Sequence, residues 1–221
     1  MKKTAVLFIM CICMGGLAAC AEEKTDDDIA ADNIRHVNIS GNAKSIILKQ
    51  STGNYFEFHN EDLDTTHTYE VYCDENGESL DINIMMEEAE ANNNILGSFV
   101  IDIPEKEFDI IEAEGDFKQI YLYTMNSDVL IHANGSTINL DLEADDMDHN
   151  ITLEGSESKE FISASVYFDK LPDNVKMELN TNQGGRINAP QNIFKDNGYE
   201  AGTGKPVISI NNTKEINTYL D

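Results

Sequence analysis

The feature that most constrains the fold is a strict alternation of apolar and polar side chains, which is complete between Thr137 and Glu143. In this segment Ile138, Leu140 and Leu142 fall on one side of an extended chain, and the polar residues fall on the other. A period of two is typical of a β-strand with one face against a core and the other in water. The segment therefore predicts a half-buried strand.

The same period recurs through most of the chain, in short segments that alternate with polar turns and, in the second half, follow one another roughly every nine to twelve residues. The expected strands lie at 34–39, 46–48, 55–58, 69–72, 80–84, 99–103, 108–110, 120–122, 129–131, 138–142, 151–153, 164–168 and 175–179. Only residues 85–91 have a locally helical pattern. We therefore predict an all-β fold of stacked short strands, β-solenoid-like, with a β-sandwich as the alternative.

Segments of the second half also resemble a known family. They are Val100-Ile101-Asp102-Ile103-Pro104 before Phe108-Asp109-Ile110-Ile111, the strand and turn units up to Leu153, and the closing Gly204-Lys205-Pro206-Val207-Ile208-Ser209-Ile210. With them, residues 98–215, at most from 34, resemble the bacterial "putative adhesin" domain, also described as autotransporter-adhesin-head-like. Members place Ser-Gly or Thr-Gly after nearly every strand, whereas this chain has Asn126-Ser127-Asp128 and Asp145-Asp146-Met147-Asp148. The resemblance implies a stacked β architecture on the cell envelope, without catalytic residues to carry over.

The first twenty residues have the pattern of an export signal. Lys2 and Lys3 precede an apolar segment at 5–14, which at roughly 1.5 Å per residue is too short for a hydrocarbon core about 30 Å thick. The following Leu17-Ala18-Ala19-Cys20 resembles the lipobox of bacterial lipoproteins, in which the cysteine receives a diacylglyceryl lipid. This resemblance implies lipidation at Cys20 and a membrane anchor. An ordinary secretory signal is the alternative.

These patterns divide the chain into three parts. Residues 1–19 are the expected lipoprotein signal peptide, and residues 20–33 the lipidated cysteine with an acidic, self-repelling tether. Residues 34–221 are the expected all-β domain, which can be divided into sub-modules at 34–97 and 98–221. We expect the protein on the extracytoplasmic face of the cell membrane, in the cell envelope.

The negative net charge limits the kinds of partner that the protein can bind. The chain has 41 acidic and 15 basic residues, and removal of Lys2 and Lys3 with the leader would take its formal charge from −26 to −28. Such a surface repels nucleic acid, which we exclude as a partner, and also anionic lipid headgroups. The expected partners are therefore the membrane, through the lipid, and an envelope or surface component that the sequence does not identify.

Cys73 is the one cysteine outside the leader and the lipidation site, so no intramolecular disulfide is expected. Because it follows a strand-like segment, we interpret it as a small buried apolar side chain rather than a reactive thiol.

An acidic segment is the best candidate for a metal site. Its carboxylates are Asp141, Glu143, Asp145, Asp146 and Asp148, and carboxylate oxygens are typical Ca²⁺ ligands. The segment lacks the glycine and the glutamate that helix-loop-helix calcium sites have at their sixth and twelfth positions. A solvated acidic turn is therefore the alternative, and we expect no other cofactor.

Two tyrosines form a candidate binding patch. Tyr121 and Tyr123 alternate with aliphatic residues and so share one outward face. Exposed aromatics of this kind suit a binding surface, and cross-strand packing that only stabilises the sheet is the alternative. With Tyr167 and Tyr199, they are also the candidates for stacking on sugars in a chain without tryptophan.

No motif commits the chain to a reaction, since serine-hydrolase, phosphate-loop and zinc-helix signatures are absent. We therefore predict a lipid-anchored envelope domain that acts as a surface binding, adhesion-like or scaffold module, without catalysis. A cation-dependent carbohydrate-active lyase or hydrolase is one alternative, for which Lys170, Lys176 and Arg186 are the candidate cations. A calcium-binding surface module is the other.

Overall fold

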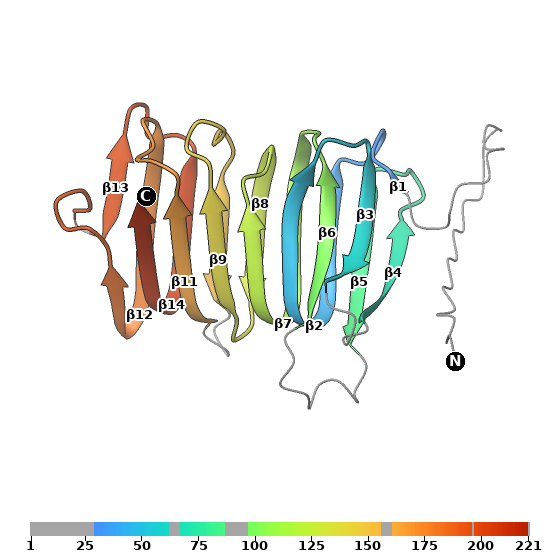
Figure 1. Ribbon diagram of the computed structural model, residues 1–221, viewed down its shortest axis with the longest axis horizontal. Coiled ribbons are helices and arrows are strands. Elements are labelled where there is room, and N and C mark those ends of the chain that lie inside the picture. The colour runs from blue at the N-terminus through green and yellow to red at the C-terminus, as the bar shows by residue number, and fades with distance from the viewer. Residues whose placement is uncertain (1–28, 62–66, 87–96, 156–160, 196, 221) are drawn as a thin grey trace.

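A computed structural model describes residues 29–61, 67–86, 97–155, 161–195 and 197–220, and within these ranges the fold is all-β, without a helix (Figure 1). The strands are β1 (Ile29–Ala30), β2 (His36–Ser51), β3 (Tyr55–Asn60), β4 (His67–Cys73), β5 (Ser79–Met86), β6 (Ser98–Pro104), β7 (Phe108–Tyr123), β8 (Ser127–Ala133), β9 (Thr137–Leu142), β10 (Ile151–Gly155), β11 (Phe161–Phe168), β12 (Val175–Asn188), β13 (Gly198–Ala201) and β14 (Val207–Leu220). Every predicted strand overlaps one of them. Of the predicted helical segment, Met85 and Met86 belong to β5, and 87–91 lie outside the described residues.

Six parallel strands close into a β-barrel. Around the ring β7 pairs with β8, β8 with β10, β10 with β14, β14 with β11, β11 with β9, and β9 with β7 again. The first halves of β7 and β14, with β8 and β10, make what we name the first wall. Their second halves, with β9 and β11, make the second wall. Outside the ring, the two halves of β2 continue the two walls beside β7. Closure pairs every strand of the ring on both sides.

The predicted β-solenoid-like stack is therefore wrong, and so is the β-sandwich alternative. Both assume separate short strands, whereas β7 and β14 are long strands that each join one wall to the other. A solenoid would also stack its segments in chain order. In this fold β14 lies between β10 and β12, which precede it in the chain.

Further strands extend the sheet beyond the ring, toward both ends of the molecule (Figure 1). At one end β2 pairs with β7, β5 and β6 pair with β2, and the antiparallel strands β4 and β3 follow, with β1 on β3. At the other end β12 pairs with β14 and carries β13. The predicted signal peptide and most of the predicted tether lie outside the described residues, so the predicted division of the chain stays a prediction.

Glycine allows the long strands to pass from one wall to the other. Gly41 of β2 lies beside Gly115 of β7, between the halves of each strand that belong to different walls. A Cβ on Gly115 would lie 2.4 Å from the carbonyl oxygen of Gly41, and one on Gly41 would lie 1.9 Å from that of Ile84. Gly41 also has a φ of 112°, which side chains other than glycine rarely tolerate.

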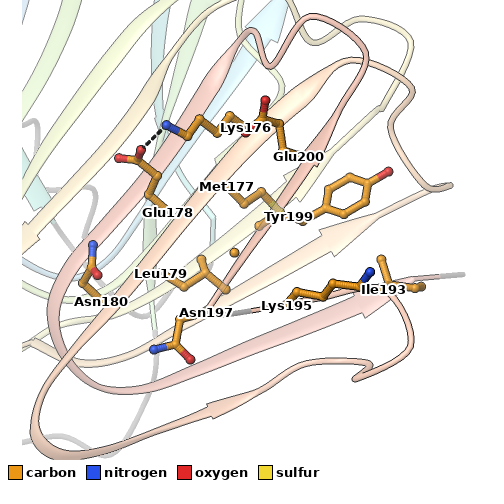
Figure 2. A pocket seen from close by; sticks show the side chains of 11 residues that line it. Lys176, Met177, Glu178, Leu179, Asn180, Ile193, Lys195, Asn197, Tyr199 and Glu200 are labelled. Atoms are coloured by element: carbon orange, nitrogen blue, oxygen red, sulfur yellow. Dashed lines mark ion pairs between the residues drawn. The ribbon is translucent and has the colours of Figure 1, made fainter.

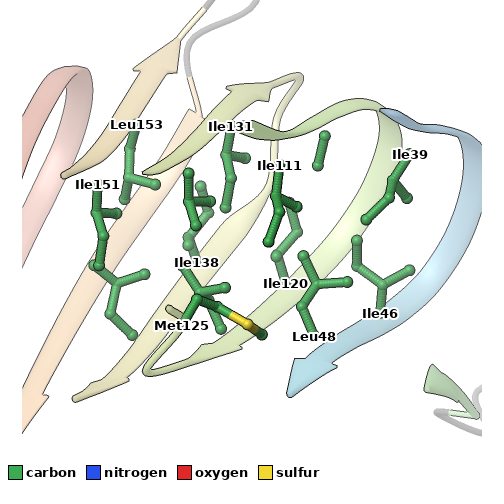
Figure 3. Close-up of a cluster of buried hydrophobic side chains, with 14 of the residues drawn as sticks. Ile39, Ile46, Leu48, Ile111, Ile120, Met125, Ile131, Ile138, Ile151 and Leu153 are labelled. Carbon is green, nitrogen blue, oxygen red and sulfur yellow. The ribbon is translucent and has the colours of Figure 1, made fainter. Parts of the chain in front are cut away.

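The space between the two walls is filled by buried aliphatic side chains in register across the strands, several of which are labelled in Figure 3. On the second wall, one such level consists of Ile46, Ile120, Ile138, Ala164 and Ile216. On the first wall, another consists of Val37, Ile111, Val129, Ile151 and Ile208. Burial of each large aliphatic side chain stabilises the fold by about 1.5–3 kcal/mol. The side chains that alternate with these levels point outward, so the polar and aromatic side chains of the strands lie on the outer surfaces of the walls.

Candidate functional site

Three exposed tyrosines and one aspartate form a line across the outer surface of the second wall. Tyr123 of β7 is in register with Asp141 of β9, Asp141 with Tyr167 of β11, and Tyr167 with Tyr219 of β14. The residue before each of them is buried, so all four side chains project outward. We name these four residues the tyrosine row.

The aromatic rings of the row are accessible. Tyr123, Tyr167 and Tyr219 are 41%, 41% and 45% exposed. Tyr167 and Tyr219 stack on each other, with ring centroids 4.6 Å apart and ring planes inclined by 10°. The row is therefore a continuous polar and aromatic strip that crosses four strands, rather than a set of scattered side chains.

Tyr121 projects from the same outer surface as Tyr123 but is half-buried. At its level the next strands carry the smaller Asn139, Ser165 and Asn217. The side chain of Asn188 donates a hydrogen bond of 2.8 Å to Asn217. Of the two predicted patch residues, Tyr123 thus belongs to the row. Tyr121 lies beside the row, at a level of shorter polar side chains. Their role in binding stays a prediction.

A cavity of about 410 Å³ opens beside the row, at the carboxyl ends of β2, β7 and β9. Its lining consists of Lys49, Gln50, Tyr123, Thr124, Asp141, Glu143 and Asp146. The cavity therefore brings together three of the five predicted metal-binding candidates and one of the two predicted tyrosines. Among the described lining residues the one cation is Lys49, whose Nζ lies 3.4 Å from Asp102 on β6, so it pairs with a carboxylate outside the cavity.

The turn after β9 holds two carboxyl groups against each other. Glu143 donates its backbone N–H to Thr124 Oγ1 over 2.7 Å, and Ala144 donates its own to Asp169 Oδ1 over 2.7 Å. In this turn a side-chain hydrogen bond with Asp146, and then the charge of Asp146, raise the pKa of Glu143 above its ordinary value. Asp146 therefore favours the protonated form of Glu143.

The remaining candidates of the acidic segment turn to other partners. Asp145 pairs with Lys170, whose pKa is raised by this hydrogen bond, and Asp148 contacts the imidazole of His149. Within the described ranges, no group of three or more His, Cys, Asp and Glu side chains is arranged to hold a metal ion. The calcium site stays a prediction from the sequence.

The cations considered for a sugar-cleaving enzyme each have a carboxylate partner. Arg186 lies 3.1 Å from Glu215, Lys176 lies 2.6 Å from Glu178, and Lys170 pairs with Asp145. The cavity beside the row, as lined by the described residues, includes none of the three. The structure thus brings Lys170 to one candidate carboxylate, Asp145, but places none of the three cations beside the carboxylates that line this cavity.

A larger cavity of about 690 Å³ lies at the end of the molecule that β12 and β13 form, between these two strands and the residues before β13 (Figure 2). Met177 and Leu179, which belong to the core, line it together with the paired Lys176 and Glu178. Tyr199, a predicted sugar-stacking residue, is half-buried here. Its hydroxyl donates a 3.0 Å hydrogen bond to the carbonyl oxygen of Pro172, so this tyrosine holds the loop between β11 and β12.

Two cysteines were singled out by sequence. Cys20 lies outside the described residues, so its lipidation stays a prediction. Cys73 is exposed at the end of β4, and its interpretation as a buried apolar side chain is wrong, because β4 lies at the outside of the sheet and pairs with β5 alone among the described strands. None of the described residues forms a helix able to cross a membrane.

Sequence reasoning missed Tyr219 and did not predict that Tyr167 aligns with Tyr123. Each of these tyrosines follows the alternation of its own strand, which predicts that it points outward. Their alignment depends on the register of strands that are far apart in the chain, for which the sequence contains no local signal.

Comparisons with known proteins are sparse. No protein-family model matches the chain, and no curated protein matches it. A crystal structure described as "a putative cell adhesion protein" from Clostridium sporogenes is similar, with 17% sequence identity and a TM-score of 0.49. The similarity covers 88% of this chain and 97% of that chain.

Proposed function

We propose that the protein is a lipid-anchored module of the bacterial cell envelope that binds a surface partner through the tyrosine row, without catalysis. The observation that carries this proposal is the alignment of Tyr123, Tyr167 and Tyr219 on one exposed surface. Tyrosine is enriched at protein interfaces because it offers a large apolar ring and a polar hydroxyl at low entropic cost. An exposed strip of three such rings is a typical feature of a binding surface.

The location is supported by the sequence. The lipobox-like Leu17-Ala18-Ala19-Cys20 would anchor the mature chain at its amino terminus, and the acidic residues 22–28 would separate the anchor from β1. The high negative charge would keep the folded part away from anionic lipid. The tyrosine row would then be free to meet a partner outside the membrane.

The carboxylates near the row suit binding better than sugar cleavage. Glycosidases hold their two catalytic carboxyl groups at least about 5 Å apart, so that the scissile bond or a water fits between them. Glu143 and Asp146 lie close enough for their side-chain contact to raise the pKa of Glu143, which is closer than that spacing. This contact supports a non-catalytic role for the cavity beside the row.

Site-specific photocrosslinking in living cells tests the proposal. A benzoylphenylalanine placed at Tyr123, Tyr167 or Tyr219 of the full-length protein is expected to give a discrete crosslinked product. The matched control is the same group at Glu154, which is also exposed but lies on the first wall. Products of equal intensity at all four positions, or at none, would overturn the tyrosine row as the binding surface.

A further inference from the structure

Asp141 lies in a slot between two tyrosines. It is in register with Tyr123 on one side and with Tyr167 on the other. Neighbouring strands are about 4.8 Å apart, so the two tyrosine Cα atoms are about 10 Å apart, with only the short aspartate between them. Because Tyr167 turns one ring face to Tyr219, its other face is directed to the side of Asp141.

The slot has a negative charge that no ion pair among the described residues neutralises. Within the described part of the chain, the side chain of Asp141 forms neither an ion pair nor a hydrogen bond. Lys49, in the adjacent cavity, is paired with Asp102. Glu143 and Asp146 line the same cavity and add to the negative potential. An anionic group would therefore be repelled from the slot.

A cation fits both the rings and the carboxylate. Centred over Asp141, it would lie about 5 Å from either tyrosine, inside the limit of about 6 Å for attraction between a cation and an aromatic face. It would also form a charge-assisted hydrogen bond with the carboxylate. A neutral sugar would gain neither the cation–π attraction nor the ionic component, although it could stack on the rings.

We propose that this slot binds the arginine or lysine side chain of an extended basic segment of a partner protein. The inference rests on the proposed function and names the chemistry of the partner. A planar guanidinium can stack between two rings and meet a carboxylate edge-on, so arginine is expected to bind more tightly than lysine. The adjacent carboxyl groups of Glu143 and Asp146 would receive a second cation of the same segment. The formal charge of −26 would speed the encounter with such a partner.

The test uses the full-length protein, purified in a neutral detergent, and fluorescein-labelled peptides of equal length. The peptides alternate glycine with arginine, lysine or citrulline, which has the shape of arginine without its charge. Fluorescence anisotropy is expected to rank arginine first, lysine about threefold weaker and citrulline at least about tenfold weaker. Equal affinity for the citrulline peptide would overturn the inference.

Variants locate the binding. Asp141→Asn is expected to weaken binding of the arginine peptide about tenfold, and Tyr123→Leu or Tyr167→Leu about threefold each.

Glu114→Gln is the matched control for charge, because Glu114 is exposed on β7 but lies on the first wall. Tyr72→Leu is the control for an exposed tyrosine outside the row. Both controls are expected to change the affinity less than about twofold. Equal losses in Asp141→Asn and Glu114→Gln would show attraction by overall charge and would contradict a specific slot.

A labelled chito-oligosaccharide separates this inference from the proposed function. If the sugar binds and the tyrosine variants lose it, while the arginine peptide does not bind, the cation slot is wrong and the tyrosine row is still a binding surface. If neither probe binds and the crosslinks at the row are also absent, both proposals are wrong.

Discussion

Gly115 packs directly against Gly41, so closely that a Cβ on Gly115 would lie 2.4 Å from the Gly41 carbonyl oxygen. Backbone cannot withdraw from such a contact as the end of a flexible side chain can. The pair lies where β2 and β7 pass from the first wall to the second. The passage of β2 and β7 from one wall to the other therefore depends on glycine at both positions.

Gly115→Ala is expected to destabilise the fold by about 2–3 kcal/mol, because the added methyl must displace backbone or the ring of Phe117. The midpoint of thermal unfolding should fall by about 5–10 °C. Gly77→Ala is the control, since Gly77 has a φ of 71° and open space around its Cβ position, and should cost only about 1 kcal/mol. Equal losses in the two variants would contradict the steric argument.

These glycines also show why the strands were easier to predict than their arrangement. Alternation is a local property, so both halves of β7 are visible in the sequence, as segments 108–110 and 120–122. Gly41, in contrast, belongs to a Ser-Gly-Asn group typical of a turn between strands, whereas the chain bends there within β2. Short separate strands suggest a stack, and two long bent strands allow a ring.

The order of the strands had no local signal either. β14 comes last in the described chain but lies between β10 and β12, a pairing that joins residues far apart in sequence. The tyrosine row depends on the same long-range register. The outward direction of Tyr123 was therefore predictable from its own strand, and its alignment with Tyr167 and Tyr219 was not.

The stack of Tyr167 on Tyr219 should contribute to stability. A double-mutant cycle with Tyr167→Ala and Tyr219→Ala is expected to give a coupling free energy of about 0.5–1 kcal/mol in urea unfolding. The control cycle combines Tyr121→Ala with Tyr219→Ala, because β9 and β11 separate these two tyrosines. Its coupling should be close to zero. A similar coupling in both cycles would mean that the stack contributes nothing specific.

Asp146→Asn should lower the pKa of Glu143 toward its ordinary value, since it removes the charge that favours the protonated carboxyl group. A raised pKa in the folded state favours folding at acidic pH, and this advantage is lost as pH rises through the folded-state pKa. The stability of the wild type relative to Asp146→Asn should therefore decrease from acidic to neutral pH. Carboxyl-detected NMR titration and urea unfolding measure the two effects.

Asp141→Asn is the control for this titration, because the charge of Asp141 is a smaller cause of the same shift. It should lower the pKa of Glu143 less than Asp146→Asn does. An equal effect of both substitutions would show that general acidity, rather than the hydrogen bond to Asp146, raises the pKa.

Millimolar Ca²⁺ should stabilise the protein no more than Mg²⁺ at the same ionic strength. Both cations screen the repulsion among 41 acidic residues. A specific calcium site would need several oxygen ligands in one place, and Asp145 and Asp148 are turned toward Lys170 and His149. Thermal unfolding with each chloride salt measures the difference. A rise in midpoint with Ca²⁺ that Mg²⁺ does not reproduce, and that Asp141→Asn abolishes, would establish the predicted calcium site instead.

Cys20→Ala should abolish lipid attachment and release the protein from the membrane, because the thiol of Cys20 is the group to which the expected diacylglyceryl lipid would be attached. Metabolic labelling with an alkyne analogue of palmitate measures attachment, and fractionation of the cells measures release. Cys73→Ala is the matched control, since this exposed cysteine has the same chemistry but lies in β4, far along the chain from the leader. It should keep the full lipid label and the membrane location. Normal labelling of Cys20→Ala, or loss of label in Cys73→Ala alone, would show that the lipobox-like segment is an ordinary secretory signal and that the protein is held in the envelope by other means.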